Sequence, residues 1–385
     1  MAQSGTYATD SPHPTAGPSI LNEIHYVLIS VSALTVLMII TLSFVWLRKY
    51  RSLTRTIDRL QSDNRAAHPL PPDPEDFSPC VTETGSRFNK ADLSLQQLIK
   101  AGREGTIYKA KMIKGTCKGH SVFICKVAKR SVSLKRMDRE ISIMRKLGSH
   151  KNILQLLDWD ICEAPYTLIM EFVAYGTLRS YLQVNQDSLS MNSDLQHLFT
   201  ISAYHIAHAM DHLRSKMVVH CDLALRNIMV NRFPSEVKVA EFGLARDLTR
   251  MRSRRSSRNK DYKERVPLRW YPPEYFRNDH YGFKGDVWAF GIVMWEMQTF
   301  GLLPYPDLDS TEKVVQQVCA GHRNAEPDGC RPEIWQMMTD CWQEPYSMRP
   351  SFKDIVRVFE NILENDMDYV DVDNSRLLAK LEAEN

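Results

Sequence analysis

The chain has little excess charge of either sign, and basic residues are absent from its beginning. It contains 49 Lys or Arg and 46 Asp or Glu among 385 residues, a formal net charge of only +3. Such a balance gives no argument for nucleic-acid binding, and we predict no nucleic-acid partner. No Lys or Arg precedes position 48. The positive segment with which a secretory signal peptide begins is therefore missing.

The cysteines lack the spacing of a metal site or a disulfide framework. All eight lie at or after Cys80, and none belongs to a C-x-x-C or zinc-like pattern. We therefore predict reduced thiols. Residues 1–23 contain no cysteine and no N-x-Ser/Thr acceptor. A segment that short cannot bury a core, so we expect no ligand-binding domain in it.

Residues 24–47 contain no Asp, Glu, Lys or Arg. A helix of that length, at about 1.5 Å per residue, would extend roughly 36 Å and cross a hydrocarbon core of about 30 Å. Arg48, Lys49 and Arg51 follow directly, so the positive-inside rule places residues 1–23 outside and the rest in the cytoplasm. A buried core helix and a cleaved signal peptide are the alternatives. We predict a single-pass membrane protein with a transmembrane helix at 24–47.

Residues 48–87 read as a juxtamembrane linker. The basic stretch 48–67 could form a helix on anionic lipid, although a plain flank of a membrane segment has the same composition. Five prolines fall within residues 68–79, which predicts an extended conformation. The segment from Pro69 to Pro74 contains two P-x-x-P sequences that an SH3-type module could bind, but such sequences also arise by chance.

Residues 88–366 predict one α+β domain of two lobes. Short runs of β-branched and aromatic residues predict strands at 105–111, 122–127 and 167–172. Residues 134–147 place apolar side chains at spacings of four and three, which predicts a helix. After Leu195 the pattern is mostly helical. A small strand-rich lobe should therefore precede a larger helical lobe, and an acidic tail should follow at 367–385.

Five separated motifs occur in this domain in a fixed order. They begin at Ile99, Phe123, Met170, His220 and Glu241. With these motifs, and with the run Asp222-Leu-Ala-Leu-Arg-Asn227, residues 93–363 resemble the tyrosine-type protein kinases, particularly the fibroblast growth factor receptor group. The resemblance implies a two-lobed protein-kinase fold with ATP and Mg2+ as cofactors. It also implies transfer of the ATP γ-phosphate to protein tyrosine, with dual specificity as the alternative, in growth or survival signalling.

The resemblance assigns the nucleotide site to the first three motifs. Lys126 would hold the α- and β-phosphates and pair with Glu140, whereas a lysine on a surface strand is the alternative. The backbone of the segment after Met170 would bond adenine, whereas a plain core strand is the alternative. The residues assigned to nucleotide binding are Ile99, Gly102, Gly105, Ile107, Lys126, Glu140, Glu171 and Val173.

The last two motifs would supply the catalytic and metal-binding side chains. By resemblance, Asp222 accepts the proton of the substrate hydroxyl, and Arg226, four residues later, marks the tyrosine-type variant. Together with Lys126 they are the predicted catalytic residues. Asn227 and Glu241 are the predicted Mg2+ ligands.

Four positions depart from the pattern of the family. Lys100 replaces a loop glycine, Ile124 replaces an alanine that faces adenine, and Cys221 replaces an arginine that meets a phosphorylated activation loop. Glu241 replaces an aspartate, and its extra methylene shifts a carboxylate that Mg2+ needs at about 2.1 Å. These departures support a second hypothesis, a kinase-shaped scaffold that recruits signalling proteins without efficient phosphotransfer.

Two tyrosines lie in strongly charged segments. Tyr262 lies within residues 246–265, which hold nine Lys or Arg against three acidic residues and could be a solvated loop or a surface for acidic partners. Tyr369 lies in the acidic run 365–373. If phosphorylated, Tyr369 could bind an SH2-type module; a disordered acidic tail is the alternative.

Overall fold

The computed structural model describes residues 38, 41, 92–102, 105–251 and 266–366. The predicted membrane helix (but for Met38 and Thr41), the Pro-rich linker, Tyr262 and Tyr369 lie outside these residues. Within the described part of the chain, no helix is both long and apolar enough to cross a bilayer.

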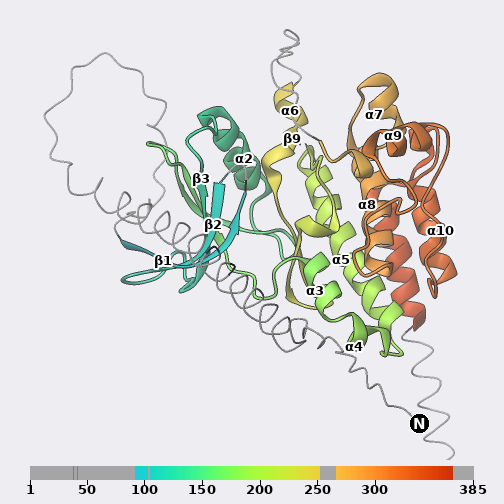
Figure 1. Cartoon of the computed structure of the whole chain (residues 1–385), viewed down its shortest axis with the longest axis horizontal. Coiled ribbons are helices and arrows are strands. Elements are labelled where there is room, and N and C mark those ends of the chain that lie inside the picture. Colours follow the sequence, from blue (N-terminus) through green and yellow to red (C-terminus); the bar gives the residue numbers. More distant parts are fainter. Residues whose placement is uncertain (1–37, 39–40, 42–91, 103–104, 252–265, 367–385) are drawn as a thin grey trace, which may run out of the picture. The chain divides into compact units, whose positions relative to one another are not determined.

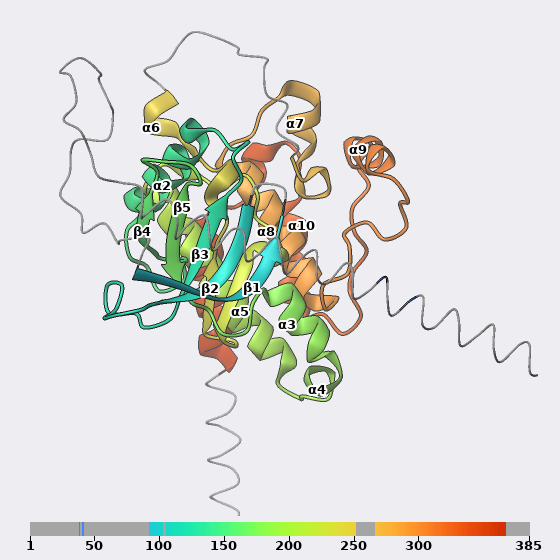
Figure 2. The same cartoon turned by 60° about the vertical axis from the view of Figure 1, so that its left-hand side comes forward.

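The small lobe is built on a five-stranded antiparallel sheet with the spatial order β1-β2-β3-β5-β4 (Figure 1 labels the first three strands, and Figure 2 labels all five). The strands are β1 Leu93–Ala101, β2 Gly105–Met112, β3 Phe123–Ala128, β4 Leu156–Asp160 and β5 Thr167–Glu171. The three strands expected from the sequence are confirmed within one residue at each end. Every residue of β3, the central strand, is buried, so a charged residue there must find its partner inside the protein.

Helix α2, Leu134–Leu147, has the bounds that the apolar spacing predicts. Met137 and Ile141 pack with Leu168 of β5 in a small apolar cluster. Glu140 lies on the same buried side of the helix. The packing of α2 against the sheet therefore holds the Glu140 carboxylate on the side of the helix that faces the sheet. The helix ends at Gly148, whose φ of 67° is a conformation that glycine adopts without steric cost.

The large lobe is mostly helical, as expected (Figure 2). Its helices are α3 Leu178–Val184, α4 Gln186–Ser190, α5 Leu195–Ser215, α6 Leu248–Met251, α7 Pro273–Asn278, α8 Phe283–Gln298, α9 Thr311–Cys319 and α10 Pro332–Cys341, with a further helix at 352–366. Helix α8 is apolar around most of its circumference and buried from Gly285 to Gln298, as expected of a helix in the centre of a core.

Four short strands in the large lobe were not expected from the sequence. They are β6 Val218–Val219, β7 Ile228–Arg232, β8 Glu236–Val239 and β9 Arg246–Asp247. Strand β6 pairs with β9, and β7 pairs with β8. The segment 220–227 connects β6 to β7, and the segment 240–245 connects β8 to β9. The two pairings therefore bring these two connecting segments side by side.

Candidate active site

The two connecting segments touch directly through their backbones. The Ala240 amide donates to the Asn227 carbonyl at 2.9 Å. The His220 ring bonds the Ala240 carbonyl at 3.0 Å. Segment 220–227 carries Asp222, Arg226 and Asn227, and segment 240–245 carries Glu241. These predicted catalytic and metal-binding residues therefore lie on neighbouring backbone segments.

Lys126 connects both lobes. Its Nζ lies 2.7 Å from Glu140 Oε1 on α2 and 3.4 Å from Glu241 Oε2 in the large lobe. Lys126 is only 8% exposed, which excludes the alternative of a surface lysine. A buried ammonium group loses its hydration, so the two carboxylates must compensate for that loss.

Glu241 is held in an unusual backbone conformation. Its φ of 66° and ψ of 75° lie in the left-handed region, which costs a residue with a Cβ about 1–2 kcal/mol. The positive charge of Lys126 lowers the pKa of Glu241 against the opposing effect of burial, and Lys100 acts in the same direction as Lys126. Glu241 is therefore ionised at neutral pH.

Asp222 is oriented by two neighbours on its own loop. Arg226 donates to Asp222 Oδ1 at 2.5 Å, and the Asn227 amide donates to the Asp222 carbonyl at 2.7 Å. The Arg226 guanidinium in turn lies 4.3 Å from the centre of the Trp270 ring, a cation–π contact. Burial raises the pKa of Asp222, whereas Arg226 and Asn227 oppose that rise.

The side chains present suit Mg2+ and the phosphates of a nucleotide. Asn227 commits its amide nitrogen to Asp222, so its amide oxygen is the atom that could reach a metal, beside the ionised carboxylate of Glu241. Both are oxygen ligands of the kind that Mg2+ prefers. Among the described residues no group of three or more His, Cys, Asp or Glu could hold a metal ion. A bound Mg2+ would therefore also need phosphate oxygens, as is usual for this ion.

The expected adenine end of the site is lined by buried apolar side chains. Ile124 lies two residues from Lys126 in β3, so both side chains point to the same face of the sheet. Ile124 is directly opposite the buried Met170 of β5 and is itself only 8% exposed. Val173 and Ile107 belong to or pack against the same apolar cluster. The extra carbons of Ile124 therefore lie on the side where adenine is expected.

The hinge is the segment after Met170, at the end of β5, and its side chains contact residues of both lobes. Glu171 forms an ion pair with Lys238 of β8 at 3.0 Å and accepts from the Gln155 amide at 2.8 Å. Lys109 of β2 lies 4.6 Å from the centre of the Phe172 ring. The alternative of a plain core strand describes Met170 well, but not these polar contacts of Glu171.

The glycines of the phosphate-covering loop differ in their physical role. A Cβ on Gly105 would lie 2.2 Å from the Val127 carbonyl oxygen, so only glycine allows β2 to approach β3 there. At Gly102 the nearest atom would be 3.7 Å away. Ile99 lies at an irregularity in the β1–β2 register and is 51% exposed. Arg103 and Glu104, at the tip, lie outside the described residues.

Two acids of α8 shape the catalytic segment, and neither is among the residues predicted for the site. Asp286 accepts from the His220 and Cys221 amides at 2.7 and 3.0 Å. Glu296 was not singled out, yet it accepts from the Leu225 amide at 3.0 Å. The available signal was an acid within an otherwise apolar helix, since such a group needs buried donors.

Cys221, which replaces an arginine of the family pattern, is buried under aromatic rings. Tyr271 donates its hydroxyl to the Cys221 carbonyl at 2.7 Å. The rings of Tyr271 and Tyr281 lie 4.5 Å apart and pack in the same cluster as Cys221. The surroundings of position 221, where the family has an arginine, are therefore filled by apolar and aromatic side chains.

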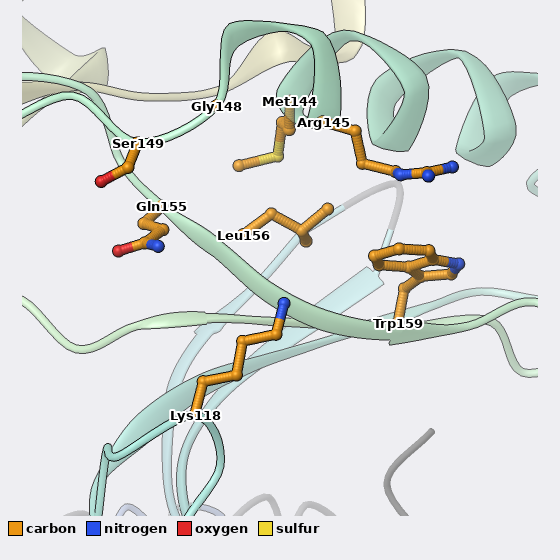
Figure 3. A pocket seen from close by; sticks show the side chains of 8 residues that line it. All are labelled: Lys118, Met144, Arg145, Gly148, Ser149, Gln155, Leu156 and Trp159. Atoms are coloured by element: carbon orange, nitrogen blue, oxygen red, sulfur yellow. The ribbon is translucent and has the colours of Figure 1, made fainter. Parts of the chain in front are cut away.

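A cavity of about 250 Å³ lies apart from the predicted site residues (Figure 3). Arg145 of α2 lies over the Trp159 ring at one side of it, at 5.2 Å from the ring centre. Its lining residues are Lys118, Met144, Arg145, Gly148, Ser149, Gln155, Leu156 and Trp159. None of the predicted site residues lines it, and the site reaches it through Gln155, whose amide bonds Glu171.

The sequence is similar to those of known tyrosine kinases, in agreement with the geometry of the site. The fibroblast growth factor receptor homolog 1 of Drosophila melanogaster is 34% identical over 253 residues, which are 62% of this chain and 34% of that protein. The tyrosine-protein kinase Abl of the same species is 31% identical over 299 residues, 77% of this chain and 17% of that protein. Fibroblast growth factor receptor 1 of Pleurodeles waltl is 34% identical over 250 residues, 60% of this chain and 29% of that protein.

The chain spans no more than about a third of the length of these relatives. A family model described as protein tyrosine and serine/threonine kinase matches residues 93–359, which is more than half of the chain. The residues matched include the whole of the site and both lobes. The chain therefore belongs to the protein tyrosine and serine/threonine kinase family.

Proposed function

We propose that the protein is a membrane-anchored protein tyrosine kinase with slow phosphotransfer. The observation that carries the proposal is the double contact of Lys126 with Glu140 and Glu241 across the two lobes. Kinase domains of this family use ATP and Mg2+. Their catalysis consists mainly of positioning and charge stabilisation, and a bridging lysine provides both.

Each side chain has a specific task in this proposal. Lys126 binds the phosphates of ATP, and Asp222, oriented by Arg226, receives the proton of the tyrosine hydroxyl at its carboxylate. Asn227 and Glu241 hold Mg2+, which neutralises charge on the phosphates when it is bound. The contact of Arg226 with Asp222 and the Trp270 ring favours tyrosine as the substrate, as do the fibroblast growth factor receptor and Abl relatives.

Two residues account for the slow turnover. The additional methylene of Glu241 displaces its carboxylate relative to the aspartate of the family, and small displacements of reacting groups cost about a hundredfold in rate. Ile124 narrows the adenine slot, so the nucleotide binds weakly. Neither residue removes a charge that catalysis needs, because the carboxylate and Lys126 are both present.

The membrane location and the partners rest on the sequence. The uncharged run 24–47 followed by Arg48 and Lys49 supports an anchor with residues 1–23 outside and the kinase domain in the cytoplasm. Protein substrates would then be met at the membrane. Tyr369 and the Pro69–Pro74 segment would recruit SH2- and SH3-type modules.

Phosphotyrosine formation by the full chain, purified in detergent micelles, tests the proposal. We expect Asp222→Asn to lower the rate at least about a hundredfold, the effect of losing a positioned base, and Glu241→Asp to raise it about tenfold or more. Asp309→Asn, which alters an exposed acid paired with Lys313, should leave the rate unchanged. Equal phosphate incorporation by wild type and Asp222→Asn would reveal a contaminating kinase and refute the proposal.

A scaffold without efficient phosphotransfer is the second candidate, and the burial of Ile124 favours it. If Ile124 blocks the adenine slot, Ile124→Ala should convert a chain that ATP–Mg2+ does not stabilise thermally into one that it does. A substantial increase in melting temperature of the wild type with ATP–Mg2+ would instead show that Ile124 does not block the slot, and efficient phosphotransfer that Asp222→Asn abolishes would contradict the scaffold.

A further inference from the structure

The hydrogen bond between Arg226 and Asp222 does not by itself fix the orientation of the guanidinium group. Arg226 Nη2 donates to Asp222 Oδ1 at 2.5 Å, and both side chains are partly exposed. One hydrogen bond sets a distance but leaves the plane of the guanidinium free to rotate, unlike a bidentate pair. A partly exposed ion pair adds little stability, and ordering a long arginine side chain costs conformational entropy. A further contact is therefore needed to hold Arg226 against Asp222.

The ring of Trp270 supplies that contact. The Arg226 guanidinium lies 4.3 Å from the ring centre, which is within the range of a cation–π interaction. The ring is buried, and its Nε1 donates to Glu296 Oε2 at 2.9 Å. The same oxygen accepts from the Leu225 amide at 3.0 Å. Because Leu225 directly precedes Arg226, one buried oxygen holds both the ring and the backbone beside the arginine that the ring covers.

The backbone turn that carries Trp270 is anchored independently of Arg226. Trp270 ends a short 3-10 helix, Leu268–Trp270. The neighbouring Arg269 donates to three carbonyl oxygens at 2.7 to 3.1 Å, those of Pro304, Tyr305 and Leu308. These carbonyls belong to the connection between α8 and α9 in the large lobe. The ring therefore has a fixed place against which the side chain of Arg226 can be ordered.

We propose that Trp270 is a positioning residue that holds the Arg226 guanidinium against Asp222 and so orients the carboxylate toward the substrate hydroxyl. This rests on the proposed kinase function. Trp270 acts through Arg226 and not on the substrate itself. Small displacements of a reacting group lower the rate strongly, so loss of the ring lowers kcat. The residues assigned to nucleotide binding lie in the small lobe and the hinge, so the KM for ATP stays the same.

Transfer of phosphate from radiolabelled ATP to a tyrosine peptide, by the full chain in detergent micelles, tests this proposal. We expect Trp270→Leu to lower kcat about tenfold, the effect of losing one desolvated cation–π contact. The KM for ATP should stay within about twofold of the wild-type value. Trp270→Phe keeps a ring over Arg226 but loses the hydrogen bond to Glu296. It should therefore lower kcat less, by about threefold.

The same substitutions in an Arg226→Ala background separate positioning from a general structural effect. If Trp270 acts through Arg226, Trp270→Leu should change kcat less than about twofold in that background. A tenfold loss in both backgrounds would overturn the proposal and leave the kinase function intact. If Trp270→Leu does not fold, Trp270→Phe decides in the same way, since its threefold loss should disappear in Arg226→Ala.

Trp335→Leu is the matched control, because Trp335 is a half-buried tryptophan of α10 whose ring packs edge-on against Trp342. It should keep the kcat of the wild type. A loss as large as that of Trp270→Leu would show that any tryptophan of this lobe has the same effect, and would overturn the role of Trp270. Equal phosphate incorporation by the wild type and Asp222→Asn would refute the kinase function, and the role of Trp270 with it.

Discussion

Glu296 is a carboxyl group that the fold buries, and no cation among the described residues forms an ion pair with it. One of its oxygens accepts from the Leu225 amide at 3.0 Å and from Trp270 Nε1 at 2.9 Å. Burial raises the pKa of Glu296 to about 7 although both hydrogen bonds oppose the rise. Near neutral pH the residue therefore changes between a neutral acid and a carboxylate while it supports the segment that carries Asp222.

Glu296→Gln should become more stable relative to the wild type as the pH rises. The raised pKa means that Glu296 favours the folded state while protonated and loses that contribution as the pH increases from about 4.5 to about 7. Glutamine stays neutral and can still accept both hydrogen bonds. Between pH 5 and pH 8 the free energy of unfolding of the variant minus that of the wild type should increase by about 2–3 kcal/mol. A pH-independent difference in urea unfolding would contradict this assignment.

Site residues that belong to a local sequence pattern could be predicted. Site residues that act through contacts with distant parts of the chain could not. Lys126 and Glu140 could be predicted because a strand motif and a helical spacing identify their positions. Glu296 contacts residues 71 and 26 positions away in the chain, and no local pattern encodes such a contact. The position of Lys100 was only partly predictable, because the face of the sheet on which it lies depends on an irregular pairing register in β1.

Helix α8 approaches its neighbours through glycine. A Cβ on Gly291 would lie 2.6 Å from Trp342 Nε1 and 2.8 Å from the Cβ of Cys341. Both contacts are shorter than real side chains allow, and both belong to buried residues at the end of α10. The close packing of α8 against α10 thus depends on the absence of a side chain at this position.

Gly291→Ala should lower the free energy of unfolding by about 1–3 kcal/mol. Overpacking of a core costs about that much, and it outweighs the gain in helix propensity from alanine, about 1 kcal/mol. Gly282→Ala is the matched control, because its Cβ would meet no atom nearer than 3.8 Å and its stability should change by less than about 1 kcal/mol. Urea unfolding of the full chain gives both values; equal effects of the two substitutions would show that α10 can move away.

Long elements with a clear period could be predicted, whereas short ones could not. The bounds of α2 follow from apolar spacing, and those of three strands follow from runs of β-branched and aromatic residues, because each element buries one face or both. Strands of two and four residues, such as β6 and β8, are too short for either signal. Their pairing is set by the large lobe as a whole, yet it is this pairing that brings Glu241 beside Asn227.

Several polar contacts link the two lobes. Lys146 at the end of α2 pairs with Asp247 of β9 at 2.6 Å, and Arg139 donates to the Gly243 carbonyl at 3.1 Å. The Leu154 amide donates to the Val239 carbonyl at 2.9 Å. Because these contacts link α2 to the segment that carries Glu241, a shift of α2 would change both partners of Lys126 together.

A group of histidines lies behind this junction, between the segment after α2 and helix α5. His150 Nδ1 accepts from the Asn152 amide at 3.1 Å, so its Nε2 carries the proton and donates to His208 Nδ1 at 3.1 Å. His212 bonds the Leu147 carbonyl at 2.8 Å. This network requires a neutral His150, since a proton on Nδ1 would oppose the Asn152 amide.

His150→Gln should therefore be less stable than the wild type at pH 7.5 and lose that disadvantage in acid. Burial, together with His212 and His208, lowers the pKa of His150 to about 4. A histidine with a depressed pKa contributes its stability above about pH 6.5 and loses it as the pH falls toward 4. At pH 7.5 the variant should lose about 1 kcal/mol, one net hydrogen bond. A shift from 6.5 to about 4 makes the wild type lose more than that in acid, so the gap should close above pH 4.5 and change sign by pH 4.5. Glu296 titrates identically in both chains and cancels in the difference. If the difference in the free energy of urea unfolding between the two proteins is constant from pH 7.5 to 4.5, the neutral imidazole of His150 does not stabilise the contact between the lobes.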